Sequence, residues 1–207
     1  MKSALVIVDV QNDFCEGGAL EVKNSNSIIP IINNLANSDK FDLIIVTKDW
    51  HPKNHKSFAS NHINKNVYDV ITLNGINQVL WPDHCVQKTK GAQLHKNLKL
   101  NRSYFTIKKG QNPEIDSYSG FYDNDHKIST GLTEYLKKKK IIKVYIVGLA
   151  TDYCVKFTAL DSINEEFTTY LIKDAVKGVN VKRGDVKQAL DEMRNAGVNI
   201  IFSKSIL

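Results

Sequence analysis

The chain has 207 residues, 42% of them hydrophobic and 24% charged, a composition typical of a soluble protein with a single domain over residues 1–207. Its net charge of +6 does not favour a nucleic-acid partner, because the lysines are scattered and the dense block at 137–140 follows a helix-like segment, as a solvated helix end would. No apolar run approaches the roughly 20 residues of a membrane span, and the first residues resemble a strand more than a secretion signal, so we expect a cytoplasmic protein.

Short apolar segments alternate along the chain with segments of helical periodicity. The expected strands are residues 4–10, 41–47, 104–110, 144–149, 168–175 and 198–204, and the expected helices are 26–38, 130–140, 152–166 and 181–197. Most of the strands are continuously apolar, which is typical of strands covered on both faces. The alternation therefore predicts an α/β fold, a parallel sheet with helices on both faces.

Residues 48–103 break this alternation. The segment is rich in His, Asn and Pro and has little periodicity. So long an irregular excursion inside a domain is usually functional or disordered, and its histidines and aromatic residues favour a functional, metal-binding or lid segment.

Polar residues gather at the ends of four expected strands. The first strand ends near Asp9, the second runs into Asp49 and His51, the third ends at Lys109, and the fourth leads to Cys154. Because ligands bind beyond the carboxyl ends of parallel strands, these side chains are candidates for one site.

Each candidate also has a plain structural interpretation. A buried Asp9 could cap a helix or tie a loop, Lys109 could be a solvated strand-end lysine, and a free cysteine is more often packed than reactive. For Cys154 the context favours chemistry. Thr151 or Asp152 can cap a helix that starts there, and the first turn of a helix lowers the pKa of a thiol.

Asp49 and His51 lie two residues apart, so both side chains point to the same side of an extended chain. A third metal ligand could come from His55, His62 or His84, and a set without a thiolate suits Zn, Mn or Fe. A simple hydrogen-bonded Asp/His pair is the alternative.

Five blocks together carry a resemblance to a known family. They are VDVQNDFCEGGAL, TKDWHPKNHKSFASNH, WPDHCVQKTKGAQLH (apart from Lys88 and Lys90), KGQNPEIDSYSGF and VGLATDYCVKFTALD, at 8–20, 47–62, 81–95, 109–121 and 147–161. They resemble the signature blocks of nicotinamidases, also called pyrazinamidases, within the isochorismatase-like cysteine hydrolases. The resemblance implies a three-layer α/β/α sandwich around a six-stranded parallel sheet of Rossmann-like topology.

The resemblance also implies roles for individual residues. The implied catalytic triad is Asp9, Lys109 and Cys154, and the implied metal ligands are Asp49, His51 and His84, with His55 as the nearest match to a further histidine used at another spacing. The implied substrate contacts are Phe14 and Trp81 on the faces of the ring, together with Tyr118, Leu149 and Ala150. A cis Leu149–Ala150 bond would turn the amides of Ala150 and Cys154 into an oxyanion hole.

The implied activity is hydrolysis of nicotinamide to nicotinic acid and ammonia in NAD salvage, through a cysteine thioester and with one divalent metal ion, zinc before manganese or iron. Pyrazinamide is a further expected substrate, and a homo-oligomer is compatible with the family. Isochorismatases lack the cysteine, and related ureidoacrylate and carbamoylsarcosine hydrolases lack the metal set. Two alternatives stay open: an amidase that uses a metal-bound hydroxide, and a metal- or redox-sensing module with Cys154 as its responsive thiol.

Overall fold

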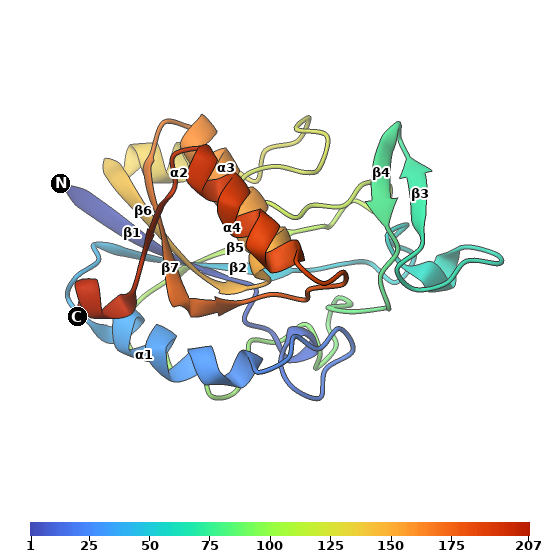
Figure 1. Ribbon diagram of the computed structural model, residues 1–207, viewed down its shortest axis with the longest axis horizontal. Helices are drawn as coiled ribbons and strands as arrows, with labels where there is room; N and C mark the ends of the chain where they lie inside the picture. Colours follow the sequence, from blue (N-terminus) through green and yellow to red (C-terminus); the bar gives the residue numbers. More distant parts are fainter.

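Six parallel strands form the central sheet of the computed structural model, which describes residues 1–207 (Figure 1). Their order is β5-β2-β1-β6-β7-β8. The bounds are Lys2–Val8 for β1, Leu43–Asp49 for β2, Phe105–Lys109 for β5, Ile141–Leu149 for β6, Thr168–Lys177 for β7 and Asn199–Ile201 for β8. The register pairs Asp49 with Lys109 and Val8 with Gly148, so the carboxyl ends of these four strands meet at one edge.

Helices cover both faces of this sheet. Helix α1 (Ile29–Asn37) lies on one face, and α2 (Leu132–Lys138), α3 (Lys156–Asn164) and α4 (Asp185–Asn195) lie on the other (Figure 1). Strand β1 supplies both interfaces, because Leu5 and Ile7 pack in the cluster with α1, whereas Val6 and Val8 pack in the cluster with α2, α3 and α4. The expected three-layer α/β/α architecture is confirmed. We propose that the chain folds as one domain, since the two clusters share the sheet.

The expected elements are present with shifted boundaries. The last strand is the shortest, and the helix expected from 152 begins with a π-helical turn at Thr151–Val155 before α3. No helix is both long and apolar enough to cross a membrane.

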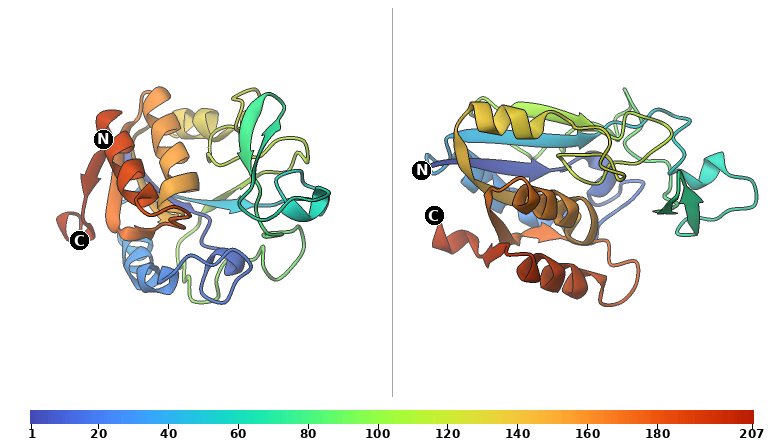
Figure 2. Two further views of the ribbon diagram at one scale, coloured as in Figure 1. Left: turned by 45° about the vertical axis from the view of Figure 1, so that its right-hand side comes forward. Right: turned by 90° about the horizontal axis from the view of Figure 1, so that it is seen from above.

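The excursion contains a hairpin that we did not expect from the sequence. Strands β3 (Val70–Leu73) and β4 (Ile76–Val79) pair antiparallel and project from the end of the sheet opposite the two termini (Figure 2). Asn74 and Gly75 both have positive φ in the connecting turn. An Asn-Gly pair between two short β-prone runs is the signal that would have found it.

At Gly148 the backbone of β6 lies closer to the backbone of β1 than a residue with a side chain would allow. Its φ is +112°, and a Cβ atom there would lie 2.1 Å from the carbonyl oxygen of Val8. Gly131 has a similar φ of +84° but open space around it, which makes it a matched control.

We expect Gly148→Ala to be far more destabilising than Gly131→Ala. The control should lose only the backbone preference, about 1–2 kcal/mol, whereas the strand clash should bring the loss for Gly148→Ala above about 4 kcal/mol. Urea unfolding monitored by circular dichroism measures both, and equal losses would contradict the close approach of β1 and β6.

Candidate active site

A pocket lies beyond the carboxyl ends of the central strands. Its lining combines polar and aromatic side chains: Phe14, Leu20, Asp49, Trp81, His84, Asp116, Tyr118, Ala150, Tyr153, Cys154 and Val179. A wider cavity of about 330 Å³ adjoins it and shares Tyr118 and Tyr153 with it. These two tyrosines therefore form the wall between the two spaces.

Lys109, at the end of β5, is the centre of the polar part of the site. Its Nζ lies 2.9 Å from Asp9 Oδ2 and 3.4 Å from Cys154 Sγ, and it donates to Asp49 Oδ1 at 2.5 Å and to the carbonyl of Ser117 at 2.9 Å. All of these side chains are buried. The structure thus brings together the three residues of the predicted triad.

Asp9 lies one residue beyond β1, whereas the sequence pattern had placed it inside the strand. Its φ is +48°, so the chain turns there and the carboxylate faces the ends of the neighbouring strands. Oδ1 accepts a hydrogen bond from the hydroxyl of Thr47 at 2.6 Å, which leaves Oδ2 facing Lys109. The apolar pattern runs on through Val10 and hides this turn.

Burial is the main cause of the pKa shifts of Asp9 and Cys154. It raises the pKa of Asp9, and it raises the pKa of the Cys154 thiol well above the usual range, with Lys109 opposing both shifts. Burial alone would lower the pKa of Lys109, but the carboxylates of Asp49 and Asp9 hold it well above its usual value. The triad therefore combines a charged ammonium, a carboxyl that is more basic than usual, and a protonated thiol.

The expectation of a lowered thiol pKa at Cys154 is wrong in this structure. The cysteine does lie in the first turn, but complete burial outweighs that position. The expected side-chain cap is also absent. Ala150 is the capping residue, and the carboxylate of Asp152 instead accepts hydrogen bonds from the amides of Val179 and Asn180 at 2.9 and 2.6 Å.

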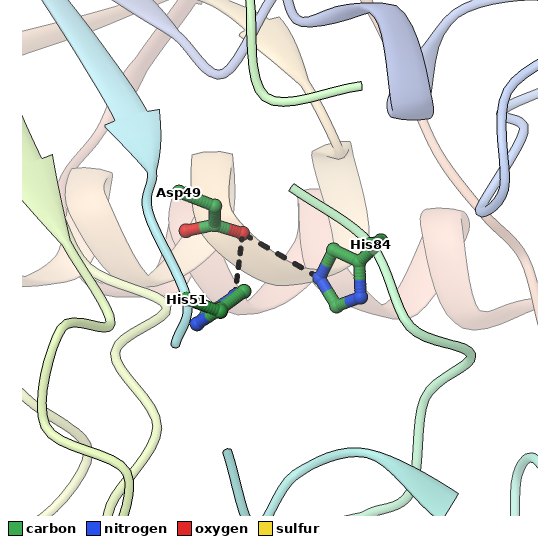
Figure 3. Close-up of side chains that lie close together, drawn as sticks. All are labelled: Asp49, His51 and His84. Atoms are coloured by element: carbon green, nitrogen blue, oxygen red, sulfur yellow. Dashed lines mark ion pairs between the residues drawn. The ribbon is translucent and has the colours of Figure 1, made fainter. Parts of the chain in front are cut away.

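Asp49, His51 and His84 form a compact group whose ligand atoms lie within 4.8 Å of one another. Figure 3 shows both histidines beside one carboxylate oxygen, with Nε2 of His51 3.5 Å and Nε2 of His84 3.7 Å from Asp49 Oδ2. Each ring donates its Nδ1 hydrogen to a backbone carbonyl at 2.8 Å, His51 to Gly110 and His84 to Pro82. Each Nε2 therefore offers a lone pair toward the carboxylate, an arrangement that fits a divalent metal ion.

His55 differs from these two histidines. It groups with His51 and Asp116, and its Nδ1 lies 2.7 Å from the hydroxyl oxygen of Ser57 and 3.2 Å from the amide nitrogen of the same residue. Its buried Nε2 has no hydrogen-bond partner. Burial lowers the pKa of His55 to about 4. The His55 ring lies 4.4 Å from that of His51, so His55 stays a candidate for a further ligand, whereas His62 is hydrogen-bonded elsewhere, to the carbonyl of Lys56.

Aromatic side chains form the rest of the wall. The rings of Phe14 and His84 are 5.3 Å apart, and Trp81 meets Tyr153 edge-on at 4.7 Å. Leu149 does not line the pocket but packs in the hydrophobic cluster, although the Leu149–Ala150 bond is cis as expected.

Several residues of the site were missed from the sequence. Leu20, Asp116, Tyr153 and Val179 line the pocket, and all of them except Val179 lie in the matching blocks, which is the signal that could have found them. Gln11 was also missed. Its side-chain amide exchanges two hydrogen bonds of 2.8 Å with the backbone of Asp49, so it continues the β1–β2 pairing past the end of β1.

Comparison with known proteins places the chain in a family. Residues 3–205 match the model of the Isochorismatase domain, and the chain therefore belongs to the isochorismatase family. Over 204 residues it is 48% identical to the nicotinamidase of Acinetobacter baylyi, a match that covers 99% of this chain and 94% of that protein.

Solved structures give the same result. A nicotinamidase/pyrazinamidase from Acinetobacter baumanii superposes with a TM-score of 0.96 at 47% identity and covers 100% of this chain and 98% of its own. The yeast nicotinamidase Pnc1p, bound to the inhibitor nicotinaldehyde, gives 0.91 at 31% identity, with 97% and 99% covered. The pyrazinamidase of Pyrococcus horikoshii, in complex with zinc, gives 0.80 at 38%, with 98% and 99% covered.

We expect His84→Ala to lose bound metal. Removing one of three ligands should lower the affinity for a divalent ion by at least about tenfold. Elemental analysis after dialysis measures the metal content, with His62→Ala as the matched histidine control that keeps it. Full metal content in the His84 variant would exclude His84 as a ligand.

Proposed function

We propose that the chain is a nicotinamidase, which hydrolyses nicotinamide to nicotinic acid and ammonia and also accepts pyrazinamide. The observation that carries the proposal is the single buried ammonium of Lys109, which contacts Asp9 and two residues that line the pocket, Asp49 and Cys154. The nicotinamidase relatives, one of them bound to nicotinaldehyde, support the choice of substrate. A place in NAD salvage follows from this activity.

The first chemical step is attack by Cys154. Asp9 takes the thiol proton, since its carboxylate and Sγ lie within 4.8 Å of each other and its raised pKa makes it a stronger base than an ordinary carboxylate. Lys109 contacts both groups and favours the negative charge that passes between them. The thiolate then adds to the carboxamide carbon, and the amides of Ala150 and Cys154 are proposed to stabilise the oxyanion, each donor contributing about 3–4 kcal/mol.

The second half of the reaction returns the enzyme to its starting state. The carbon–nitrogen bond breaks as Asp9 passes its proton to the leaving amine, so ammonia departs and a thioester on Cys154 is left. Asp9 next removes a proton from a water molecule, whose oxygen attacks the thioester carbonyl. The carbon–sulfur bond breaks, the sulfur recovers a proton from Asp9, and nicotinic acid is released.

Asp49, His51 and His84 would hold one divalent ion. Their one carboxylate and two imidazoles suit zinc, which the pyrococcal relative contains, and also suit manganese or iron. When bound, the ion supplies a fixed Lewis acid for a ring nitrogen, so that it acts as a template. Phe14 and Trp81 are proposed to pack on the ring and to complete its orientation.

Replacing Cys154 by alanine should reduce ammonia release by at least about 10³-fold, because no other thiol contacts Lys109. Cys15→Ala is the matched control: Cys15 is buried away from the pocket, and burial raises its pKa to about 11, so its removal should leave the rate within about threefold. Mass spectrometry of acid-quenched wild-type enzyme should show the thioester. Wild-type activity in the Cys154 variant would instead favour a metal-bound hydroxide as the nucleophile.

The position of the ring nitrogen should decide turnover. Pyrazinamide has a nitrogen in the same relation to the carboxamide as nicotinamide, benzamide has none, and picolinamide has it only at the adjacent position. We expect kcat/KM for the last two amides to fall by about 100-fold, since a site built for a polar contact rejects analogues that lack it. Equal turnover of all four amides would remove the template role of the metal group.

A further inference from the structure

The hairpin β3–β4 contributes one buried side chain to the interior. Each of its strands has four residues, and among them only Gln78 is buried, with 1% of its surface exposed. The other strand residues are exposed or half-buried. A polar side chain buried so completely from an otherwise exposed hairpin needs hydrogen-bond partners, and its partners lie at the pocket.

Gln78 contacts two residues that line the pocket with Cys154. Its Nε2 lies 3.1 Å from the hydroxyl of Tyr118 and 3.2 Å from Oδ2 of Asp116, and it also donates to the carbonyl of Val79 at 2.7 Å. Tyr118 and Asp116 are forty and thirty-eight residues further along the chain. The hairpin is thus joined to the active-site wall by a long-range contact.

The carboxylate of Asp116 fixes the orientation of this amide. Oδ1 of Asp116 accepts the amide hydrogen of Ser117 at 2.8 Å, and Oδ2 faces the amide group of Gln78. The reverse orientation would place the oxygen of Gln78 against a carboxylate oxygen, with no hydrogen between two acceptors. Gln78 therefore presents its amide hydrogens, and not its oxygen, to Asp116 and Tyr118, and its two hydrogens are shared among these two residues and the carbonyl of Val79.

The hydroxyl oxygen of Tyr118 accepts from two sides. Nε1 of Trp81 lies 3.2 Å from this oxygen and Nε2 of Gln78 lies 3.1 Å from it. Both aromatic rings line the pocket, and both pack edge-on against Tyr153, at 4.7 Å for Trp81 and 5.5 Å for Tyr118. One hydroxyl oxygen therefore fixes the relative position of two rings of the wall.

We propose that Gln78 is a positioning residue for substrate binding: it holds the hydroxyl of Tyr118 and, through it, the Trp81–Tyr118 wall against which the heteroaromatic ring packs. The inference rests on the proposed function and gives the hairpin a part in it. Gln78 does not line the pocket itself, so it acts through Tyr118 and Asp116.

The decisive variant is Gln78→Leu, which keeps the bulk of the side chain and removes both donors. We expect KM for nicotinamide to rise about tenfold, because this change corresponds to the free energy of one to two hydrogen bonds. We expect kcat to stay within about twofold of the wild-type value. A less ordered wall should weaken the binding of the substrate and of the transition state equally. Such a loss raises KM and leaves kcat unchanged. Asn77→Leu is the matched control on the same strand, because Asn77 is exposed and makes none of these contacts.

Two further readouts separate positioning from a general loss of stability. In a Trp50→Phe background Trp81 is the only tryptophan left, and its fluorescence should change with Gln78→Leu but not with Asn77→Leu. In a Tyr118→Phe background, Gln78→Leu should raise KM by less than about half of its effect in the wild type, because coupled residues are not additive.

Unchanged KM and unchanged Trp81 fluorescence in Gln78→Leu would overturn the proposal, as would full additivity with Tyr118→Phe. If the leucine variant does not unfold cooperatively, Gln78→Met, with its unbranched chain, takes its place with the same expectations. A wild-type protein that does not hydrolyse nicotinamide would refute the proposed function. The fluorescence change would still decide whether Gln78 holds the wall.

Discussion

The ammonium of Lys109, buried among carboxylates at the carboxyl edge of the sheet, is the interaction on which the site depends. A buried charge is tolerated only when it is paired and hydrogen-bonded, and here the partners come from β2 and from the segments after β1, β5 and β6. Asp49 links the two halves of the site, because one oxygen contacts Lys109 and the other faces His51 and His84. The proposed nucleophile and the proposed metal ligands are therefore parts of a single electrostatic unit.

The N-terminal loop holds the excursion against this unit. Residues after β1 pair with the backbone around 91–95, and the carboxylate of Asp13 accepts the amide hydrogen of Cys85 at 2.7 Å. Gly91 allows this contact, since a Cβ atom there would lie 2.0 Å from the Asp13 carboxylate. His84 is thus positioned by a residue more than seventy positions earlier in the chain. The irregular segment 48–103 is therefore held in a fixed place beside the site.

The sequence predicted the layers, and it named the Asp, Lys and Cys at the strand ends, because apolar runs and the polar residues that end them are local signals. The resemblance to the family selected His84 from three candidate histidines, because no local pattern shows which of them lies beside Asp49 and His51. Other features depend on contacts that a single sequence does not show. The raised pKa of the Cys154 thiol follows from burial. The pairing of Gln11 with Asp49 follows from the register of two strands. The contact of Gln78 with Tyr118 joins a hairpin of two four-residue strands to a distant loop. Leu149 was expected at the substrate because it precedes Ala150 in a matching block, but its side chain turns into the core.

The close approach at Gly148 has a consequence for how such a chain can change over evolutionary time. The ends of β1 and β6 are held against each other by main chain at Val8 and Gly148, with no side chain between them. The spacing between the turn that carries Asp9 and the turn that carries Cys154 is therefore independent of which apolar residues fill the layers above and below. Core side chains can change by compensating substitutions while the two groups proposed to react, Asp9 and Cys154, keep their separation. A glycine without any chemical role thus makes the catalytic geometry tolerant of sequence divergence elsewhere in the protein.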